Sequence, residues 1–179
     1  HSFLVITSIY SDHFDGLKNR EKEFLDYFQD SQKFIHAPAI ESGKYRVLLS
    51  PEVTGVFTHE SFGHKSEADF LIADPEAAKH WVMGQTVASD IVSIVDCGLH
   101  EGTSGYVPVD DEAQPAKKNY LIKNGVLAGR LHSQETSTVL NEDPTGNARA
   151  KDFTFEPIVR MTSTYIEPGS LSKEELIVK

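Results

Sequence analysis

The sequence lacks several features that would assign it to a special class of protein. It has one cysteine, Cys97, in 179 residues, which excludes an intrachain disulfide framework and predicts a reducing compartment. Its longest apolar runs, at residues 3–6 and 70–73, are far shorter than the roughly 18 residues that a membrane span needs. No basic stretch precedes an apolar segment at the start of the chain, so no signal peptide is predicted. We therefore expect a cytoplasmic protein that does not enter a membrane.

A net positive charge is also absent. Asp and Glu number 27 against 17 Lys and Arg, which gives a formal net charge of −10. Proteins that bind nucleic acid carry basic surfaces that neutralise phosphates, so this composition argues against a nucleic-acid partner. The hydrophobic content of 39% and the charged content of 25% are ordinary for a soluble globular protein. A chain of this length fits one domain, with or without a small piece of another.

Local patterns predict short helices and strands that alternate irregularly. The pair Asn124-Gly125 is typical of a type I′ turn and predicts a hairpin. This mixture favours an α+β fold with a largely antiparallel sheet, a helix that carries a metal motif and a few other short helices. The predicted helices cover residues 17–35, a segment from Thr54, residues 74–84 and 133–141, and a capped turn at Ser172; the predicted strands cover residues 3–10, 44–50, 86–98, the two arms of the hairpin within 119–133, and 157–169.

The segment HESFGH, residues 59–64, contains the residue types of a catalytic zinc site. The imidazoles of His59 and His64 can bind zinc, and the carboxylate of Glu60 can take a proton from an attacking water. In the common H-E-x-x-H motif the two histidines stand four apart and share one helix face, whereas here they stand five apart. At about 100° per residue, these side chains would point roughly 140° apart on a regular helix. Such a helix could not bring both imidazoles to one ion.

Two local distortions would reconcile this spacing with a metal ion. A wider π-type turn, with bonds from residue i to i+5, would bring the histidines back to one side. A helix that ends near Gly63 would have the same effect. The alternative is that His59 and Glu60 are an ordinary surface pair with no metal. The spacing alone leaves both interpretations open.

Several separated motifs occur in an order that resembles the TldD/PmbA metalloprotease family. Between about Tyr45 and Gly169 the chain contains HESFGHKSEADF, GQTVAS, VDDEAQP, LIKNGVLAGRL, PTGNAR and RMTSTY. The HESFGH motif favours the TldD-like branch of the family. The resemblance implies a zinc-dependent peptidase that cleaves unfolded or extended peptides in the cytoplasm. It also implies a homo-oligomer or a family-related partner subunit.

The resemblance assigns roles to individual residues. His59 and His64 would bind zinc, and Glu60 would be the general base. Glu67 and Asp69, just after the motif, would support the ligands or the local structure. Further candidates for the peptide path are Asp110, Asp111, Arg160 and Thr162. For each of these four residues, a purely structural role is the alternative.

The sequence also departs from the family pattern. The third zinc ligand of the family is a cysteine beyond the RMTNT strand, and the chain ends at Lys179 before that region. Cys97 does not match that ligand, and we expect it to be a buried thiol. Ser163 replaces the Asn of RMTNT, and Ala113 replaces a Gly of the acidic motif.

These departures suggest a fragment of a longer protein. We expect residues 1–43 to be the end of an N-terminal region and residues 44–179 to be part of a metallopeptidase C-terminal domain. Such a fragment would contain two of three zinc ligands and could be inactive by itself. Two other functions stay open: a non-catalytic module of the same family that holds peptides or a partner by strand pairing, and an unrelated domain with structural histidines.

Overall fold

The computed structural model describes residues 18–178, which divide into two compact units. Of the described residues, 18–47 with 102–104 belong to the first unit, and 48–101 with 105–178 belong to the second. The strand that the sequence predicts at residues 3–10 lies outside the described residues.

The described part of the first unit contains one helix, α1 (Glu21–Ile35). The helix predicted at residues 17–35 is therefore confirmed from Glu21 onward. Its apolar residues Phe24, Leu25 and Phe28 recur at helical spacing, but none is buried. This amphipathic helix therefore exposes its apolar side chains in the described chain.

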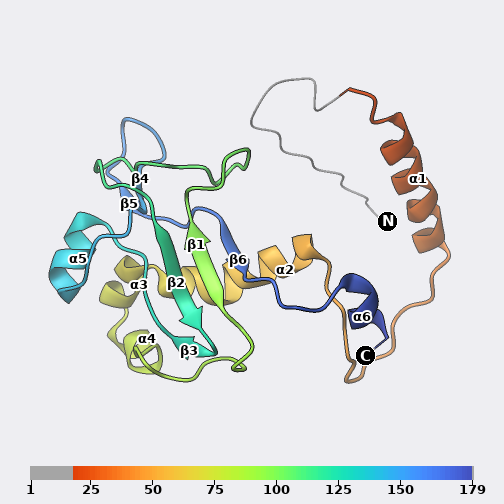
Figure 1. Ribbon diagram of the computed structural model, residues 1–179, viewed down its shortest axis with the longest axis horizontal. Coiled ribbons are helices and arrows are strands. Elements are labelled where there is room, and N and C mark those ends of the chain that lie inside the picture. The colour runs from red at the N-terminus through yellow and green to blue at the C-terminus, as the bar shows by residue number, and fades with distance from the viewer. Residues whose placement is uncertain (1–17, 179) are drawn as a thin grey trace. The chain divides into compact units, whose positions relative to one another are not determined.

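The second unit is built on a four-stranded antiparallel sheet with the strand order β3-β2-β1-β6 (Figure 1). In the central strand β1, Val95 pairs with Tyr120 of β2 and with Tyr165 of β6. A separate two-stranded sheet joins β4 to β5. This architecture confirms the predicted α+β class with antiparallel pairing. The strands are β1 (Ile94–Cys97), β2 (Lys118–Lys123), β3 (Val126–Leu127), β4 (Ala148–Arg149), β5 (Ile158–Val159) and β6 (Thr164–Ile166).

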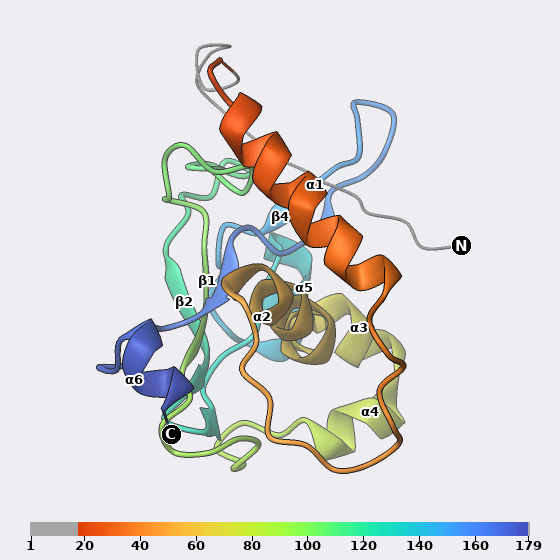
Figure 2. The same ribbon diagram turned by 90° about the vertical axis from the view of Figure 1, so that its right-hand side faces the viewer.

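Short helices make up the remaining regular structure of the second unit. They are α2 (Pro51–Thr58), the π-helical turn η2 (His59–Gly63), the 3-10 turn η3 (His64–Ser66), α3 (Ala68–Ala73), α4 (Pro75–His80), α5 (Gln134–Leu140) and α6 (Lys173–Ile177). Figure 2 shows α2, α3 and α4 on one side of the sheet that contains β1 and β2. No helix among residues 18–178 is both long enough and apolar enough to cross a membrane.

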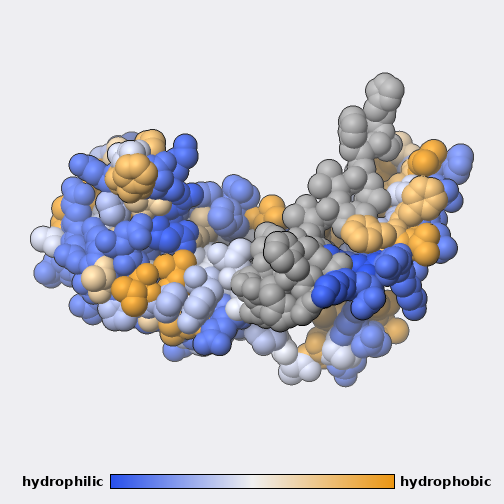
Figure 3. Space-filling model, turned by 90° about the horizontal axis from the view of Figure 1, so that it is seen from above, coloured by the Kyte–Doolittle hydropathy of each residue, from blue (hydrophilic) through white to orange (hydrophobic). Residues whose placement is uncertain are grey.

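The core of the second unit lies between the sheet and these helices. Ile94, Leu121 and Ile122 of the sheet are fully buried, and Leu71 and Trp81 pack against them from the helical side. Apolar side chains also reach the surface, as the orange patches among blue ones in Figure 3 show. The buried cluster fixes the sheet against the helices that carry the HESFGH segment.

The predicted hairpin is confirmed at Asn124-Gly125. Both residues have positive φ, 50° and 78°, as a type I′ turn requires. Glycine is also needed here for space, because a Cβ on Gly125 would lie 2.6 Å from the carbonyl oxygen of Ala88. The turn therefore joins β2 to β3 and touches the loop that precedes β1.

The predicted helix starts are confirmed at Asp74, Ser133 and Ser172, whose side chains accept hydrogen bonds from backbone N–H groups of the first turn. The start predicted at Thr54 is wrong. The helix begins at Pro51, because the Ser50 hydroxyl accepts the N–H of the third residue of the helix.

Three predicted strands differ from the structure. Residues 44–50 form no strand, because no other described segment pairs with their backbone. The strand predicted at 86–98 is reduced to its last part, β1, and the strand predicted at 157–169 is divided into β5 and β6, which belong to different sheets. Alternating apolar residues predicted extended chain here, but the pairing depends on distant partners.

Candidate metal centre

The HESFGH segment continues α2 as a π-helical turn. The backbone N–H of His64 donates to the carbonyl oxygen of His59, which is the i to i+5 bond of a π-helix. This bond brings the two imidazole rings to a centroid separation of 4.7 Å with an angle of 82° between their planes. The wider turn that the sequence analysis offered as one solution is therefore the one that forms.

The turn also brings Glu60 to the same place. Metal-ligating atoms of His59, Glu60 and His64 all lie within 4.8 Å of one another. His59 is half-buried, and the other two residues are exposed. Among the described residues this is the one cluster of His, Cys, Asp or Glu with the geometry to hold a metal ion.

Glu67 supports this cluster from the protein interior. It is 4% exposed, and its Oε2 lies 2.8 Å from Nδ1 of His64. Burial raises the pKa of Glu67 above its ordinary value, while the hydrogen bond to His64 acts in the opposite direction. A carboxylate that holds Nδ1 fixes the ring and leaves Nε2 for a metal ion.

Gly63 provides close packing at the end of the turn. It has a helical φ of −60°, so its backbone does not need the freedom of glycine. A Cβ at this position would lie 2.0 Å from Sδ of Met161. The π-helical turn does end at Gly63, as one of the two predicted distortions placed it, and the glycine lets the turn rest on the Met161 side chain.

Asp69 contacts backbone rather than the histidine cluster. Its Oδ2 accepts the N–H of Val159 in β5 at 3.2 Å, and its Oδ1 accepts the N–H of Phe70 at 2.9 Å. The carboxylate therefore ties the start of α3 to the small sheet.

The acidic pair Asp110 and Asp111 also binds backbone. Asp110 is buried, and its Oδ1 accepts the N–H of Gln114 while its Oδ2 accepts the N–H of Ala148, each at 2.9 Å. Asp111 is exposed, and its Oδ2 accepts the N–H of Ala150 at 2.8 Å. Both carboxylates therefore hold their own loop against the β4 segment.

Asp96 is a polar centre that the sequence analysis missed. Its carboxylate is fully buried in β1 and accepts both the N–H and the hydroxyl of Thr162, at 2.9 and 2.6 Å. It also accepts the Thr164 hydroxyl at 2.7 Å and Nδ2 of Asn147 at 2.9 Å. Thr162, predicted on the peptide path, therefore binds Asp96. The available signal was a charged residue within the apolar run IVDC.

Two arginines lie near this polar centre. The Arg160 side chain is exposed, while its backbone N–H donates to the carbonyl oxygen of Asn147 at 2.8 Å. Arg149, another residue that the sequence analysis missed, donates from its guanidinium to the carbonyl oxygen of Met161. Burial lowers the pKa of Arg149, and the positive charge of Arg160 lowers it further. The two positive charges are thus close enough to interact.

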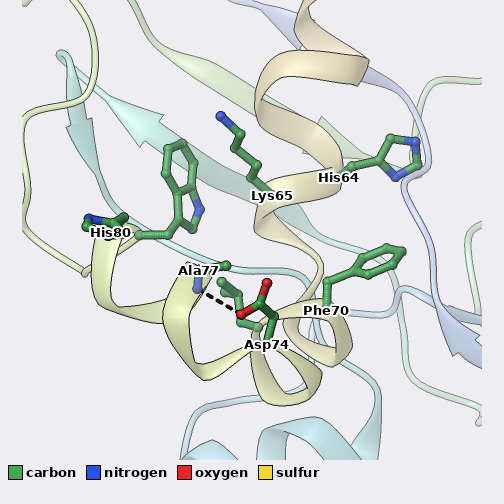
Figure 4. A pocket seen from close by; sticks show the side chains of 8 residues that line it. His64, Lys65, Phe70, Asp74, Ala77 and His80 are labelled. Atoms are coloured by element: carbon green, nitrogen blue, oxygen red, sulfur yellow. Dashed lines mark hydrogen bonds between the residues drawn. The ribbon is translucent and has the colours of Figure 1, made fainter.

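A pocket opens directly beside His64 (Figure 4). Figure 4 shows the side chains of His64 and Phe70 toward one side of it and His80 across from them. The ring of Phe70 meets the His64 ring edge-on, with centroids 6.2 Å apart. One of the two clustered histidines is therefore also part of a pocket wall.

Comparison with known proteins shows the family of this chain. Residues 42–179 match the family model of the PmbA/TldA metallopeptidase C-terminal domain. The chain belongs to the TldD/PmbA metallopeptidase family. Relatives within this family include a metalloprotease of Synechocystis, 38% identical over 92% of this chain and 35% of the relative. Another is the zinc metalloprotease TldD homolog of Saccharolobus solfataricus, 34% identical over 89% of this chain and 34% of the relative.

Two solved structures have a similar fold. TldE from Thermococcus kodakarensis matches 70% of this chain and 28% of its own, with 25% identity and a TM-score of 0.57. A Thermotoga maritima protein described as a modulator of a DNA gyrase matches 71% of this chain and 27% of its own, with 26% identity and a TM-score of 0.56. The chain spans about a third of the length of the metalloproteases that it matches.

Proposed function

We propose that this chain carries the zinc-binding and general-base residues of a peptidase active site. The π-helical turn supports the proposal most directly, because it gathers the ligand atoms of His59, Glu60 and His64 within 4.8 Å. The two imidazoles suit zinc as ligands, and the neighbouring Glu60 carboxylate can act as the base. The bond between Glu67 and His64 orients one imidazole so that Nε2 is left for the ion.

Each residue has a distinct task in this mechanism. When bound, zinc lowers the pKa of a water molecule to about 7 and polarises a carbonyl group. Glu60 is exposed and, among the described residues, its carboxylate has no hydrogen-bond partner, so its oxygens are open to a proton. We assign it to take the proton from the attacking water and to return it to the leaving amine.

The third protein ligand belongs, in this proposal, to a segment outside these residues, as the cysteine of the family pattern. Cys97 does not take this role, because it is buried in β1 and is not a member of the histidine cluster. The zinc metalloprotease TldD homolog among the relatives supports zinc as the metal and the TldD-like branch. The proposed substrates are unfolded or extended peptides in the cytoplasm. The proposed enzyme acts as a homo-oligomer or together with a related subunit.

The other candidate residues shape the surroundings of this site. Asp69, Asp110 and Asp111 bind backbone N–H groups, which favours a role in holding the loops beside a peptide path. Thr162 serves the same purpose through Asp96. Arg160 has an exposed positive charge, and we assign it to contact with the peptide.

The test compares Glu60→Gln with the unchanged sequence in the complete, zinc-loaded protein. The variant should lose about 10²- to 10⁴-fold in casein hydrolysis and keep its zinc content, because only the proton acceptor is removed. Glu76→Gln, on an exposed position of α4, is the matched control and should retain full activity. Full activity of Glu60→Gln would overturn the assignment. Peptide binding without chelator-sensitive cleavage would instead favour the non-catalytic module.

A further inference from the structure

The pocket beside His64 is large enough for an amino-acid side chain and has a mostly apolar wall. Its volume is about 540 Å³, and it is formed by α3, α4 and the turn η3. Phe70, Leu71, Ala77 and Trp81 supply its apolar surface. Pockets of this size and lining bind apolar groups, with a few polar groups that orient them.

The pocket shares one residue, His64, with the candidate metal centre. This residue belongs both to the histidine cluster and to the pocket wall. Phe70 packs edge-on against the same imidazole, at 6.2 Å between ring centroids, and also lines the pocket. The pocket therefore adjoins the cluster of candidate ligand atoms at His64.

The polar wall of the pocket includes charges of both signs, from Asp74 and Lys65. Oδ1 of Asp74 accepts the backbone N–H groups of Glu76 and Ala77, one of which is drawn in Figure 4, so the carboxylate is held at the start of α4. Lys65 places its positive charge 5.7 Å from the ring centre of Trp81. The positive charge of Lys65 offsets the negative charge of Asp74 and repels a basic group, and the aromatic rings supply apolar surface, so the wall favours a neutral apolar side chain over a basic one.

Trp81 and Ala77 form two different parts of the pocket wall. The indole nitrogen of Trp81 is buried and has no hydrogen-bond partner among the described residues. A shift of the ring would therefore break no hydrogen bond of that nitrogen. Ala77 is exposed and carries the smallest side chain of the wall, so the entrance is not closed by bulk.

We propose that this pocket is the subsite for an aromatic or branched aliphatic side chain of the peptide residue next to the scissile bond. The inference rests on the proposed peptidase function, because the scissile bond must sit at the histidine cluster. The pocket would determine which substrate side chain the site prefers, a property that the metal chemistry alone does not set.

Binding can be tested without catalysis, because Trp81 is the only tryptophan of the chain and lines the pocket. The 179-residue chain, kept metal-free with chelator, is titrated with N-acetyl-phenylalanine amide and with N-acetyl-glycine amide while tryptophan fluorescence is recorded. The phenylalanine compound should bind roughly tenfold or more tightly, as burial of its side chain requires. Equal affinities, or no saturable change with either compound, would overturn the proposal.

A matched pair of variants locates the binding. Ala77→Phe fills the pocket from α4 and should weaken binding of the phenylalanine compound at least tenfold. Ala73→Phe places the same side chain at an exposed position of α3 that does not line the pocket, and should bind as the unchanged chain does. Equal binding by both variants would place the ligand elsewhere and refute the subsite.

A second measurement separates this inference from the proposed function. With Co²⁺ in the complete protein in place of zinc, nuclear magnetic resonance should show broadened ring signals of the bound phenylalanine compound, because the pocket adjoins His64. Retained Co²⁺ without broadening would refute the subsite and leave the peptidase proposal intact. If the protein binds the compound but retains neither zinc nor Co²⁺, the proposed peptidase function is refuted. The pocket would then be an apolar binding site that is unrelated to a metal.

Discussion

Two carboxylates of the second unit, those of Asp96 and Glu60, differ in what surrounds them. Asp96 is fully buried in β1 and accepts hydrogen bonds from Thr162, Thr164 and Asn147. Glu60 is exposed beside two imidazoles and has no hydrogen-bond partner among the described residues. The oxygens of Asp96 accept hydrogen bonds from other protein groups, whereas the oxygens of Glu60 are available to bind a ligand or water.

Glu67 lies between these two cases. It is buried like Asp96, but its side chain binds His64 of the exposed cluster. It therefore connects the interior of the protein to the candidate metal centre. The comparison suggests that burial and bonding partners, rather than residue type, separate carboxylates that stabilise the fold from those that act on a ligand.

The largest effect on stability is expected at Asp96. Asp96→Ala removes the acceptor of the Thr162 N–H, of the Thr162 and Thr164 hydroxyls and of one Asn147 Nδ2 hydrogen, so the free energy of unfolding should fall by about 3 kcal/mol. Urea unfolding of the chain measures this change. Asp90→Ala, at an exposed position, is the control and should stay within about 0.5 kcal/mol. Equal stability of the two variants would remove the distinction between Asp96 and an ordinary surface carboxylate.

A smaller effect is expected at Glu67, on metal binding. Glu67→Gln weakens the acceptor for Nδ1 of His64, so zinc affinity of the complete protein should fall about 10- to 100-fold. Competition with a coloured chelator measures the affinity, and Glu76→Gln on α4 is the control with unchanged affinity. If Glu67→Gln lowers stability while zinc binds as before, Glu67 belongs with Asp96 as a structural carboxylate.

The smallest effect is expected at Ala113, in the loop that Asp110 holds. Ala113 has a φ of 62°, a left-handed conformation that costs a side chain about 1 kcal/mol, and the family pattern has glycine there. Ala113→Gly should therefore raise the free energy of unfolding by up to about 1 kcal/mol in thermal or urea unfolding. Ala116→Gly, where φ is not positive, should lower it by about 0.5 kcal/mol. A loss of stability in both variants would mean that Asp110 already offsets the strain of this loop.

The candidate metal centre was largely predictable, because its geometry is local. The angle between residues five apart required either a wider turn or a helix end, and the π-helical bond from His64 to His59 is the first of these. The hairpin at Asn124-Gly125 was predictable for the same reason, since both residues of the turn need positive φ.

Features that depend on distant partners were not predictable. The alternating residues 44–50 predicted a strand, but Val47 and Leu48 are exposed and pair with no described strand. The network around Asp96 joins β1 to residues more than fifty positions away, so the sequence showed only an isolated acid in an apolar run. The contact of Gly63 with Met161 was hidden in the same way.

The extra residue of the π-helical turn also determines the position and rotation of the residues that follow it. Compared with a regular helix, one inserted residue advances every later position by about 1.5 Å and about 100°. With this advance, Gly63 lies on Met161 and the N–H of Ala68 reaches the carbonyl oxygen of Leu131 at 3.1 Å. Deletion of Ser61 would restore the H-E-x-x-H spacing but rotate those later contacts out of alignment. A single residue thus sets the rotation between the side of the chain that holds the metal ligands and the side that packs on the core.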